Sequence, residues 1–229
     1  MSTALVLLSG GIDSTTCVAL AHKAFGSGNV KGVSFIYGQK HDREVFAAHA
    51  VADFYHMPHE IIDLPNVFEG SGSTLIDHDR ATPECSYDEI EGVSPTYVPF
   101  RNGILTSYAA AVALTQACDF VYFGAHSEDA AGWAYPDCTP EFIGSMASAI
   151  YVGTYHKVRL LTPLQWMDKK GVIKLGLELG APYQLTWSCY DGKEVACGVC
   201  PTCRSRRDAF RACGTEDRIL YADDLSNDE

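Results

Sequence analysis

The sequence has little that would suit a membrane protein or a nucleic-acid-binding protein. It contains no uninterrupted apolar run of about 18 residues, the length a helix needs to cross a bilayer. Lysine and arginine number 17 against 29 aspartates and glutamates, which gives a formal net charge of −12. A surface of that sign repels nucleic-acid phosphates, so we expect no direct contact with DNA or RNA. The first residues also lack the basic region and the small-residue cleavage site of a secretion signal, and we therefore expect a cytoplasmic protein.

Internal repeats and low-complexity segments are also missing from the sequence. The chain has 229 residues, of which 47% are apolar and 20% are charged, the proportions of a globular protein with a sizeable core. This length suits one domain with at most a small appendage. We divide the chain into an α/β domain at residues 1–182 and a C-terminal segment at residues 183–229.

Predicted strands and helices alternate along residues 1–182, which indicates a parallel sheet with helices on both faces, a Rossmann-like α/β fold. Ligands bind beyond the carboxyl ends of the strands in such sheets. Between the third strand and the following helix, residues 65–99 are rich in glycine and proline and predict a long functional loop. The expected strands are 3–8, 30–37, 60–64, 120–125 and 158–161, and the expected helices are 14–25, 41–56, 102–117, 141–152 and 169–179.

The loop at residues 9–15, Ser-Gly-Gly-Ile-Asp-Ser-Thr, joins the first strand to the first helix. Two glycines let a ligand approach the backbone, and the helix N-terminus behind them favours an anion. No lysine follows as in a Walker loop, and the glycine spacing of a dinucleotide loop is absent. Asp13 either caps the helix, orients the loop or faces a magnesium ion. Composition alone therefore leaves open a phosphate site and an ordinary capped turn.

Four cysteines lie close together near the end of the chain, at Cys189, Cys197, Cys200 and Cys203. In a reducing compartment, clustered thiols bind metal more often than they form disulfides. Four thiolates at this spacing predict a structural tetrahedral zinc ion. An iron–sulfur cluster also takes four cysteines, and a pair of redox thiols is the further alternative. Cys213, ten residues beyond the last of the four, is interpreted as a bystander.

The loop at residues 9–14 resembles the pyrophosphate-binding loop of the N-type ATP pyrophosphatases, whose fold is that of the adenine nucleotide alpha hydrolases. Members of that superfamily bind ATP over this loop and activate a carbonyl oxygen. Together with the four-cysteine motif, the loop makes the chain similar to the 7-cyano-7-deazaguanine synthase family. Further stretches that carry the resemblance over nearly the whole chain are 8–17, 37–41, 98–102, 135–138 and 162–164.

The resemblance implies an enzyme that converts 7-carboxy-7-deazaguanine, ammonia and ATP into the nitrile for queuosine or archaeosine precursors. It further implies Mg²⁺ at the nucleotide, Zn²⁺ on the four cysteines, and a homodimer. No room is left for a glutaminase domain, so ammonia must come from solution or from a partner. ATP is expected on residues 8–18, which are Leu8, Ser9, Gly10, Gly11, Ile12, Asp13, Ser14, Thr15, Thr16, Cys17 and Val18.

The expected catalytic residues are Asp13, Ser14, Arg101 and Asp137. Arg101 lies just before a predicted helix, with Asn102 as a possible cap, and is interpreted either as a ligand of a phosphate or substrate carboxylate, or as part of a surface ion pair. Asp137 is expected to accept hydrogen bonds from the guanine-like edge of the substrate. Lys40 and His41 follow the second strand and are interpreted as solvated polar residues. Cys138 has no evident activating base, and we therefore do not assign it as a nucleophile.

Three alternatives remain at this point. The first is a related enzyme that stops at the amide or amidates another carboxylate. The second is a tRNA sulfur transferase with the same ATP loop, against which the acidic charge and the lack of an activated cysteine argue. The third is a zinc-containing nucleotide-binding module without catalysis.

Overall fold

The computed structural model describes residues 2–130 and 133–225. Residues 1 and 131–132 of the predicted first domain, and 226–229 of the predicted C-terminal segment, lie outside this range. Five strands form one sheet in the order β3-β2-β1-β4-β5, and every neighbouring pair is parallel. The strands are β1 (Ala4–Leu7), β2 (Val30–Ile36), β3 (His59–Asp63), β4 (Phe120–Tyr122) and β5 (Arg159–Leu161). The predicted parallel α/β sheet is confirmed.

Helices connect these strands at the predicted places, with shifted ends. Asp168 caps α6 by accepting the N–H of Gly171, and Thr139 caps α5 by accepting the N–H of Phe142. The structure also has 3₁₀ turns at η1 (Tyr87–Glu89), η3 (Pro136–Cys138) and η4 (Tyr183–Leu185). The helices are α1 (Ile12–Phe25), α2 (Arg43–Phe54), α3 (Arg101–Thr115), α4 (Ser127–Ala130), α5 (Pro140–Gly153), α6 (Lys169–Glu178), α7 (Pro201–Ala212) and α8 (Ala222–Leu225).

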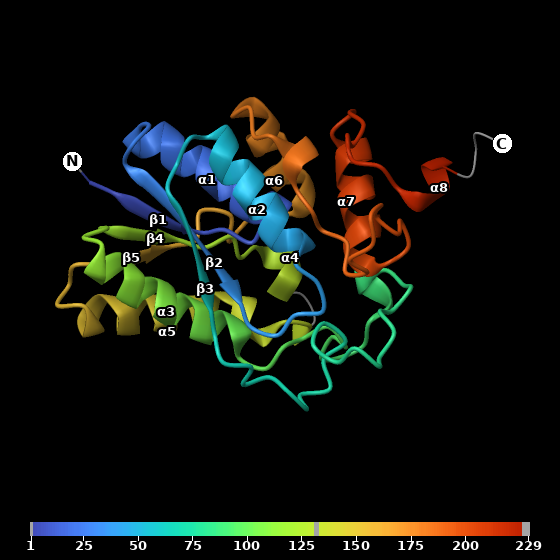
Figure 1. Cartoon of the computed structure of the whole chain (residues 1–229), viewed down its shortest axis with the longest axis horizontal. Coiled ribbons are helices and arrows are strands. Elements are labelled where there is room, and N and C mark those ends of the chain that lie inside the picture. Colours follow the sequence, from blue (N-terminus) through green and yellow to red (C-terminus); the bar gives the residue numbers. More distant parts are fainter. Residues whose placement is uncertain (1, 131–132, 226–229) are drawn as a thin grey trace.

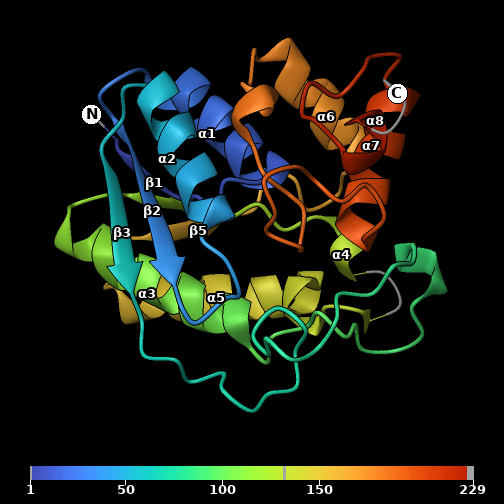
Figure 2. The same ribbon diagram turned by 45° about the vertical axis from the view of Figure 1, so that its right-hand side comes forward.

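Alternate residues of β1 pack on opposite faces of the sheet. Ala4 and Val6 join a core with α1, α2 and α6, whereas Leu5 and Leu7 join a second core with α3 and α5. Figures 1 and 2 show these two helix layers above and below the sheet. Because both faces of the central strand are covered, the apolar run at the start of the sequence is buried throughout, as expected for a parallel sheet.

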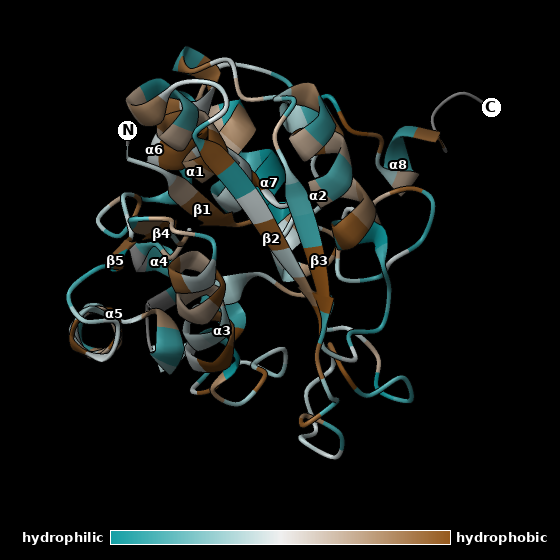
Figure 3. Ribbon diagram, turned by 60° about the vertical axis from the view of Figure 1, so that its left-hand side comes forward, coloured by the Kyte–Doolittle hydropathy of each residue, from teal (hydrophilic) through white to brown (hydrophobic). Residues whose placement is uncertain are grey.

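The strand β3 lies at one edge of the sheet and is only partly buried (Figure 3). The predicted strand at residues 120–125 ends at Tyr122, and the remaining residues continue as a loop. This shortening matters because Gly124 packs against the first turn of α1: a Cβ on Gly124 would lie 3.1 Å from the Cβ of Asp13. Among residues 2–130 and 133–225, no helix combines the length and apolar composition that crossing a bilayer requires.

The C-terminal segment has a small core of its own and also shares the main one. Cys189, Cys200, Cys203 and two neighbouring apolar residues form the small cluster. Phe210 of α7 instead belongs to the core under α1 and α6, where its ring meets that of Tyr183 edge-on at a centroid distance of 5.7 Å. The segment is therefore joined to the α/β body through α7, and the domain boundary at residue 182 stays a prediction.

A buried ion pair holds this segment together. Arg206 of α7 has a side chain only 1% exposed, and it contacts both carboxylate oxygens of Asp217, at 2.5 and 2.9 Å. The guanidinium also donates to the carbonyl oxygen of Tyr183 at 3.1 Å and to Oγ1 of Thr186 at 2.8 Å. Asp217 is itself 5% exposed and accepts a further hydrogen bond from Tyr221. Each nitrogen of the guanidinium therefore has a hydrogen-bond acceptor. A charged side chain can be buried only when it is paired in this way.

We expect Arg206→Leu to lower the free energy of unfolding by about 3–5 kcal/mol, because it leaves the Asp217 carboxylate buried without its cation. The matched control is Arg207→Leu, which removes the next arginine and its ion pair with the exposed Asp223. That loss should stay below about 1 kcal/mol. Urea unfolding monitored by circular dichroism measures both, and equal losses would contradict the assignment of Arg206 as the residue that holds the C-terminal segment together.

Candidate active site

A cavity of about 260 Å³ lies at the carboxyl ends of β1, β2 and β4, where the sheet predicts a ligand. Its walls come from the loops after these three strands, the first turns of α2, α3 and α6, the loop at residues 65–99 and the cysteine-bearing segment. The lining residues used below are Leu7, Leu8, Ser9, Gly11, Ile12, Asp13, Ser14, Val33, Phe35, Tyr37, Lys40, His41, Tyr87, Arg101, Asn102, Asp129, Tyr135, Cys138, Lys169, Trp187, Ser188 and Tyr190.

The two glycines of the first loop serve different purposes. Gly10 has φ +84°, and a Cβ there would lie 2.2 Å from the carbonyl oxygen of Glu44, so glycine is needed for α2 to pack on the loop. Gly11 is not crowded in this way: the nearest atom to its Cβ position is Oγ of Ser9 at 3.5 Å. Because Gly11 lines the cavity, its missing side chain leaves the backbone open to a ligand.

The N-terminus of α1 opens into this cavity without a cap. No side chain in the described part of the chain accepts from its first turn, and Gly11 occupies the N-cap position. Free N–H groups and the positive end of the helix dipole therefore face the ligand space. The hydroxyl of Ser14 donates to the carbonyl oxygen of Gly11 at 3.1 Å and contacts Oγ of Ser9 at 3.1 Å, which holds the loop in this shape. This arrangement suits a phosphate group.

Asp13 lies within a cluster of charged groups. The Nζ atom of Lys169 donates to both carboxylate oxygens of Asp13 at 2.8 Å and lies 2.9 Å from Nε2 of His126. His126 is 1% exposed and also contacts Asp129 at 3.5 Å. Burial by itself raises the pKa of Asp13, but the positive charges of Lys169 and His126 outweigh it and hold that pKa well below its ordinary value. The carboxylate is therefore ionised and paired.

Sequence reasoning missed Lys169 and His126. The first follows the loop after β5 and the second follows β4, so both lie at the ligand-binding edge of the sheet. Their positions could have revealed them, because a basic residue just beyond a strand of a parallel sheet lies where ligands bind. A Walker loop carries its lysine within the loop itself. Here a lysine 156 residues further along the chain reaches the same place in space.

Arg101 lies in the cavity wall at the start of α3, and its guanidinium is not engaged with a carboxylate in the part of the chain that the structure describes. It donates to the hydroxyl of Tyr37 at 3.3 Å and to Oδ1 of Asn102 at 3.4 Å. The surface ion pair that the sequence left open is therefore not present. A half-buried guanidinium held by neutral groups beside a cavity is suited to an anionic ligand.

Asp137 is 3% exposed and does not line the cavity. Its carboxylate accepts the backbone N–H of Asn102 at 3.0 Å, in the first turn of α3. Its expected contact with a guanine-like edge stays a prediction. The neighbouring Cys138 lines the cavity, but burial raises the pKa of its thiol well above the ordinary value, in keeping with a cysteine that is not a nucleophile.

Only the first part of residues 8–18, the predicted ATP-binding segment, lies at the cavity, up to the first turn of α1. Most of its members before residue 15 line the cavity, whereas Gly10 and the later residues do not. The hydroxyl of Thr16 bonds Tyr183 at 2.7 Å, and the side chains of Cys17 and Val18 lie in the core. The buried Oγ1 of Thr15 has no hydrogen-bond partner among the described residues. Any role of residues 15–18 in holding ATP would therefore be indirect.

Lys40 and His41 are not simply solvated, as the sequence suggested. Both line the cavity, and Nζ of Lys40 donates to the carbonyl oxygen of Arg80 at 2.5 Å. The side chain of His41 packs over Gly192, where a Cβ would lie 2.4 Å from the ring. These two residues connect the loop at 65–99 and the C-terminal segment to the rim of the cavity.

The four predicted metal ligands are brought together. The Sγ atoms of Cys189, Cys197, Cys200 and Cys203 all lie within 4.8 Å of one another. Sγ of Cys189 accepts the backbone N–H groups of Cys197 at 3.3 Å and of Asp191 at 3.4 Å, as metal-bound thiolates often do. Cys213 lies apart and donates to the carbonyl oxygen of Lys170. The cluster could therefore bind a metal ion.

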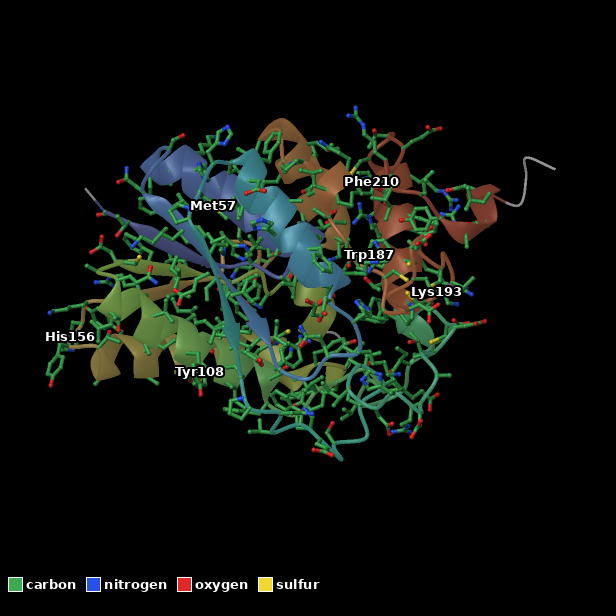
Figure 4. All side chains as sticks on the ribbon, in the orientation of Figure 1. Met57, Tyr108, His156, Trp187, Lys193 and Phe210 are labelled. Atoms are coloured by element: carbon green, nitrogen blue, oxygen red, sulfur yellow. The ribbon has the colours of Figure 1, made fainter. Side chains whose placement is uncertain are left out.

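The segment that carries Cys189 also contacts the loop at residues 9–15. The backbone N–H of Trp187 donates to the carbonyl oxygen of Gly10 at 2.9 Å, and its indole Nε1 donates to the carbonyl oxygen of Cys189 at 2.8 Å. Figure 4 marks Trp187 where the C-terminal segment meets α2. The cysteine cluster and the phosphate loop are therefore two neighbouring parts of one site.

Comparison with known proteins gives relatives over nearly the whole chain. A protein from Thermoplasma volcanium named 7-cyano-7-deazaguanine synthase is 39% identical, over 96% of this chain and 90% of that protein. One of the same name from Oceanobacillus iheyensis is 41% identical over 95% of this chain and 97% of its own. Among solved structures, the U34-tRNA thiolase NcsA from Methanococcus maripaludis, with its [4Fe-4S] cluster, has a TM-score of 0.51 at 17% identity.

That alignment covers 92% of this chain and 66% of the thiolase chain, and it supports a common fold alone. The model of the family described as queuosine biosynthesis protein QueC matches residues 3–214, a range that includes both the phosphate loop and the four cysteines. The chain therefore belongs to the QueC family, as the two motifs of its sequence predict.

Proposed function

We propose that this chain is an ATP-dependent ligase that converts 7-carboxy-7-deazaguanine and ammonia into 7-cyano-7-deazaguanine for queuosine biosynthesis. The observation that carries the proposal is the uncapped N-terminus of α1, which faces a cavity together with the largely buried Lys169. Two sources of positive potential at one point match the triphosphate of ATP. The family membership supplies the identity of the acid.

The reaction requires two activations of one carbon atom. Ammonia cannot displace oxide from a carboxylate, so the oxygen is first adenylated, with release of pyrophosphate, and then leaves as part of AMP when ammonia attacks. The amide oxygen is adenylated by a second ATP in the same way, and loss of AMP and protons leaves the nitrile. One site used twice performs both rounds, and its contribution is positioning and charge neutralisation.

The residues of the cavity divide this work. The N–H groups of the first turn of α1 hold the phosphates, and Lys169 exchanges part of its contact with Asp13 for phosphate oxygens. Arg101 holds the carboxylate of the acid at the nucleotide. Asp13 and Asp129 are the carboxylates with which the cavity would hold Mg²⁺, an ion that prefers oxygen ligands and neutralises phosphate charge when bound.

Zinc is the metal proposed for the four cysteines. The observed Sγ–Sγ distances, such as 3.9 Å between Cys197 and Cys203, suit four thiolates around one ion, for which tetrahedral bonds of about 2.3 Å imply a spacing of about 3.8 Å. An iron–sulfur cubane separates its four thiolates further, because each binds a different iron. With four protein ligands the ion would have no open position, so we assign it a structural role.

The chain is further proposed to act in the cytoplasm as a homodimer, to take ammonia from solution or from a partner, and to make no direct contact with nucleic acid. The last point is supported by the net charge of −12.

The experiment that tests the proposed function is an assay of the purified protein with 7-carboxy-7-deazaguanine, ATP, Mg²⁺ and ¹⁵N-ammonium chloride. We expect mass spectrometry to detect the ¹⁵N-nitrile, with two AMP formed for each product. A reaction that ends at the ¹⁵N-amide with one AMP would contradict nitrile formation. A rate of ATP hydrolysis that is the same with and without 7-carboxy-7-deazaguanine would contradict the assignment as a ligase.

A further inference from the structure

Three tyrosines from distant parts of the chain form one wall of the cavity. Tyr87 lies in η1 of the loop at residues 65–99, Tyr135 precedes η3, and Tyr190 follows the metal ligand Cys189. We refer to Tyr87, Tyr135 and Tyr190 as the tyrosine wall. None of the roles assigned above to the phosphate loop, the charged cluster or the cysteines uses these side chains.

The members of the tyrosine wall contact one another. The hydroxyls of Tyr87 and Tyr190 are 2.8 Å apart and share a hydrogen bond. The rings of Tyr87 and Tyr135 meet edge to face, with centroids 6.4 Å apart and planes at 74°. The hydroxyl of Tyr135 is itself bonded to Thr96 and, at 3.2 Å, to Ser94. The three rings therefore form one connected, oriented surface.

Each end of the shared hydrogen bond is held in place independently. Tyr87 opens a 3₁₀ turn that is fixed by a capping box, in which the side chain of Glu89 accepts the backbone N–H of Ser86 at 2.6 Å. Tyr190 is adjacent to Cys189, whose thiol accepts two backbone N–H groups of the cysteine segment. A metal ion on the cysteines would thus fix the backbone that presents Tyr190 to the cavity.

The sheet order places the tyrosine wall on one side of the phosphate loop. The strands follow one another as β2-β1-β4, so the loop after β1 lies between the ends of β2 and β4. On the β2 side the cavity is lined by Val33 and Phe35, which suit the apolar faces of adenine. On the β4 side, Tyr135 and Cys138 belong to one apolar cluster, against which Tyr87 packs. A ligand joined to the nucleotide at its phosphates must extend to that second side.

We propose that the tyrosine wall binds the flat heterocycle of the acid substrate and determines its specificity, with Tyr87 and Tyr190 acting as a pair. This proposal rests on the proposed function for the identity of the acid. Aromatic rings stack on purine-like rings without needing specific hydrogen bonds to them. The wall offers such ring faces next to the phosphate loop. The hydroxyl of Tyr135 lies beside this pair, and the three hydroxyls can exchange hydrogen bonds among themselves for bonds to the heterocycle.

The test measures acid binding separately from ATP binding in four variants: Tyr190→Leu, Tyr190→Phe, Tyr87→Phe and the double phenylalanine variant. We expect Tyr190→Leu, which removes the ring, to raise both the Kd and the KM for 7-carboxy-7-deazaguanine about tenfold or more. Its KM for ATP should stay within about twofold of the wild-type value, and its zinc content, measured by plasma mass spectrometry, should not change.

The phenylalanine variants test the pair as a unit. Each single change removes the same hydrogen bond, so we expect each to raise the KM for the acid by about threefold and the double variant to do no more. Tyr155→Phe is the matched control, because Tyr155 is 83% exposed and does not line the cavity, and it should leave all constants unchanged. These variants also keep the test decisive should Tyr190→Leu fail to fold.

The outcomes distinguish this proposal from the proposed function. If the wild-type protein makes the nitrile and Tyr190→Leu binds the acid normally, or loses ATP binding equally, the tyrosine wall is refuted while the function stands. Additive effects of the two phenylalanine changes would likewise refute the pair. A wild-type protein that binds no acid at all would refute both.

Discussion

Asp13→Ala is expected to lower kcat by about 100- to 1000-fold, the range that loss of one strong electrostatic contact at a reacting centre produces. In the structure Asp13 is the partner of Lys169, with Nζ at 2.8 Å from both of its oxygens. The substitution removes a carboxylate that is proposed to hold Mg²⁺ and also releases the lysine from its position beside the loop at residues 9–15. Initial rates of pyrophosphate release at saturating ATP and acid measure the loss, and a variant with full rate would contradict the assignment.

The same substitution is expected to cost about 2 kcal/mol of folding stability, because Lys169 keeps a largely buried charge without its partner. The cost is smaller than for a fully buried pair, since 27% of the Asp13 side chain is exposed to solvent. The pKa of Asp13 is depressed in the folded state, so the pair stabilises the fold above the ordinary carboxyl pKa and loses this effect as the pH falls through the depressed value. The difference between wild type and variant should therefore shrink in acid.

A double variant separates the two effects. Asp13→Asn combined with Lys169→Met removes both charges and keeps similar side-chain volumes. We expect it to recover most of the stability, because no buried charge remains unpaired, yet to stay as inactive as the single variant. Recovery of activity together with stability would mean that the pair is only structural.

Cys200→Ser is expected to reduce bound zinc from about one ion per chain to nearly none, as measured by plasma mass spectrometry of the purified protein. Cys200 is 1% exposed and lies in the small C-terminal cluster, which has few apolar residues to hold it together without a metal. The binding free energy of a structural zinc ion is folding free energy, so we expect a loss of about 5 kcal/mol or more, concentrated in the C-terminal segment. Limited proteolysis should cleave that segment first.

Cys213→Ser is the matched control, because Cys213 lies in the same segment but outside the cluster. It should keep both metal and stability. The loss of zinc should also reduce activity before the α/β body unfolds, since Trp187 connects the cysteine segment to the carbonyl of Gly10. A Cys200→Ser variant that retains zinc at full stoichiometry would contradict the four-thiolate site.

The parts of the site that the sequence could predict are those that lie within one short segment. The loop at residues 9–15 and the cysteines within residues 189–203 combine residue type, spacing and local backbone geometry, so each motif is complete without the rest of the fold. Alternating apolar runs likewise predicted the parallel sheet. Strand ends were less accurate: residues 123–125 are apolar enough for a strand, but β4 ends at Tyr122 and Gly124 packs against the first turn of α1.

What the sequence alone determined, then, is an α/β sheet with a glycine-bearing loop after its first strand and a cluster of four cysteines near its end. The tertiary structure decided which groups act on that loop. Lys169 reaches Asp13 from 156 residues away, and Tyr87 meets Tyr190 from 103 residues away. The physical reason is that a parallel sheet gathers the carboxyl ends of its strands at one edge in an order that differs from their order in the chain. Contacts across that edge are set by strand pairing and packing, and no local pattern records them.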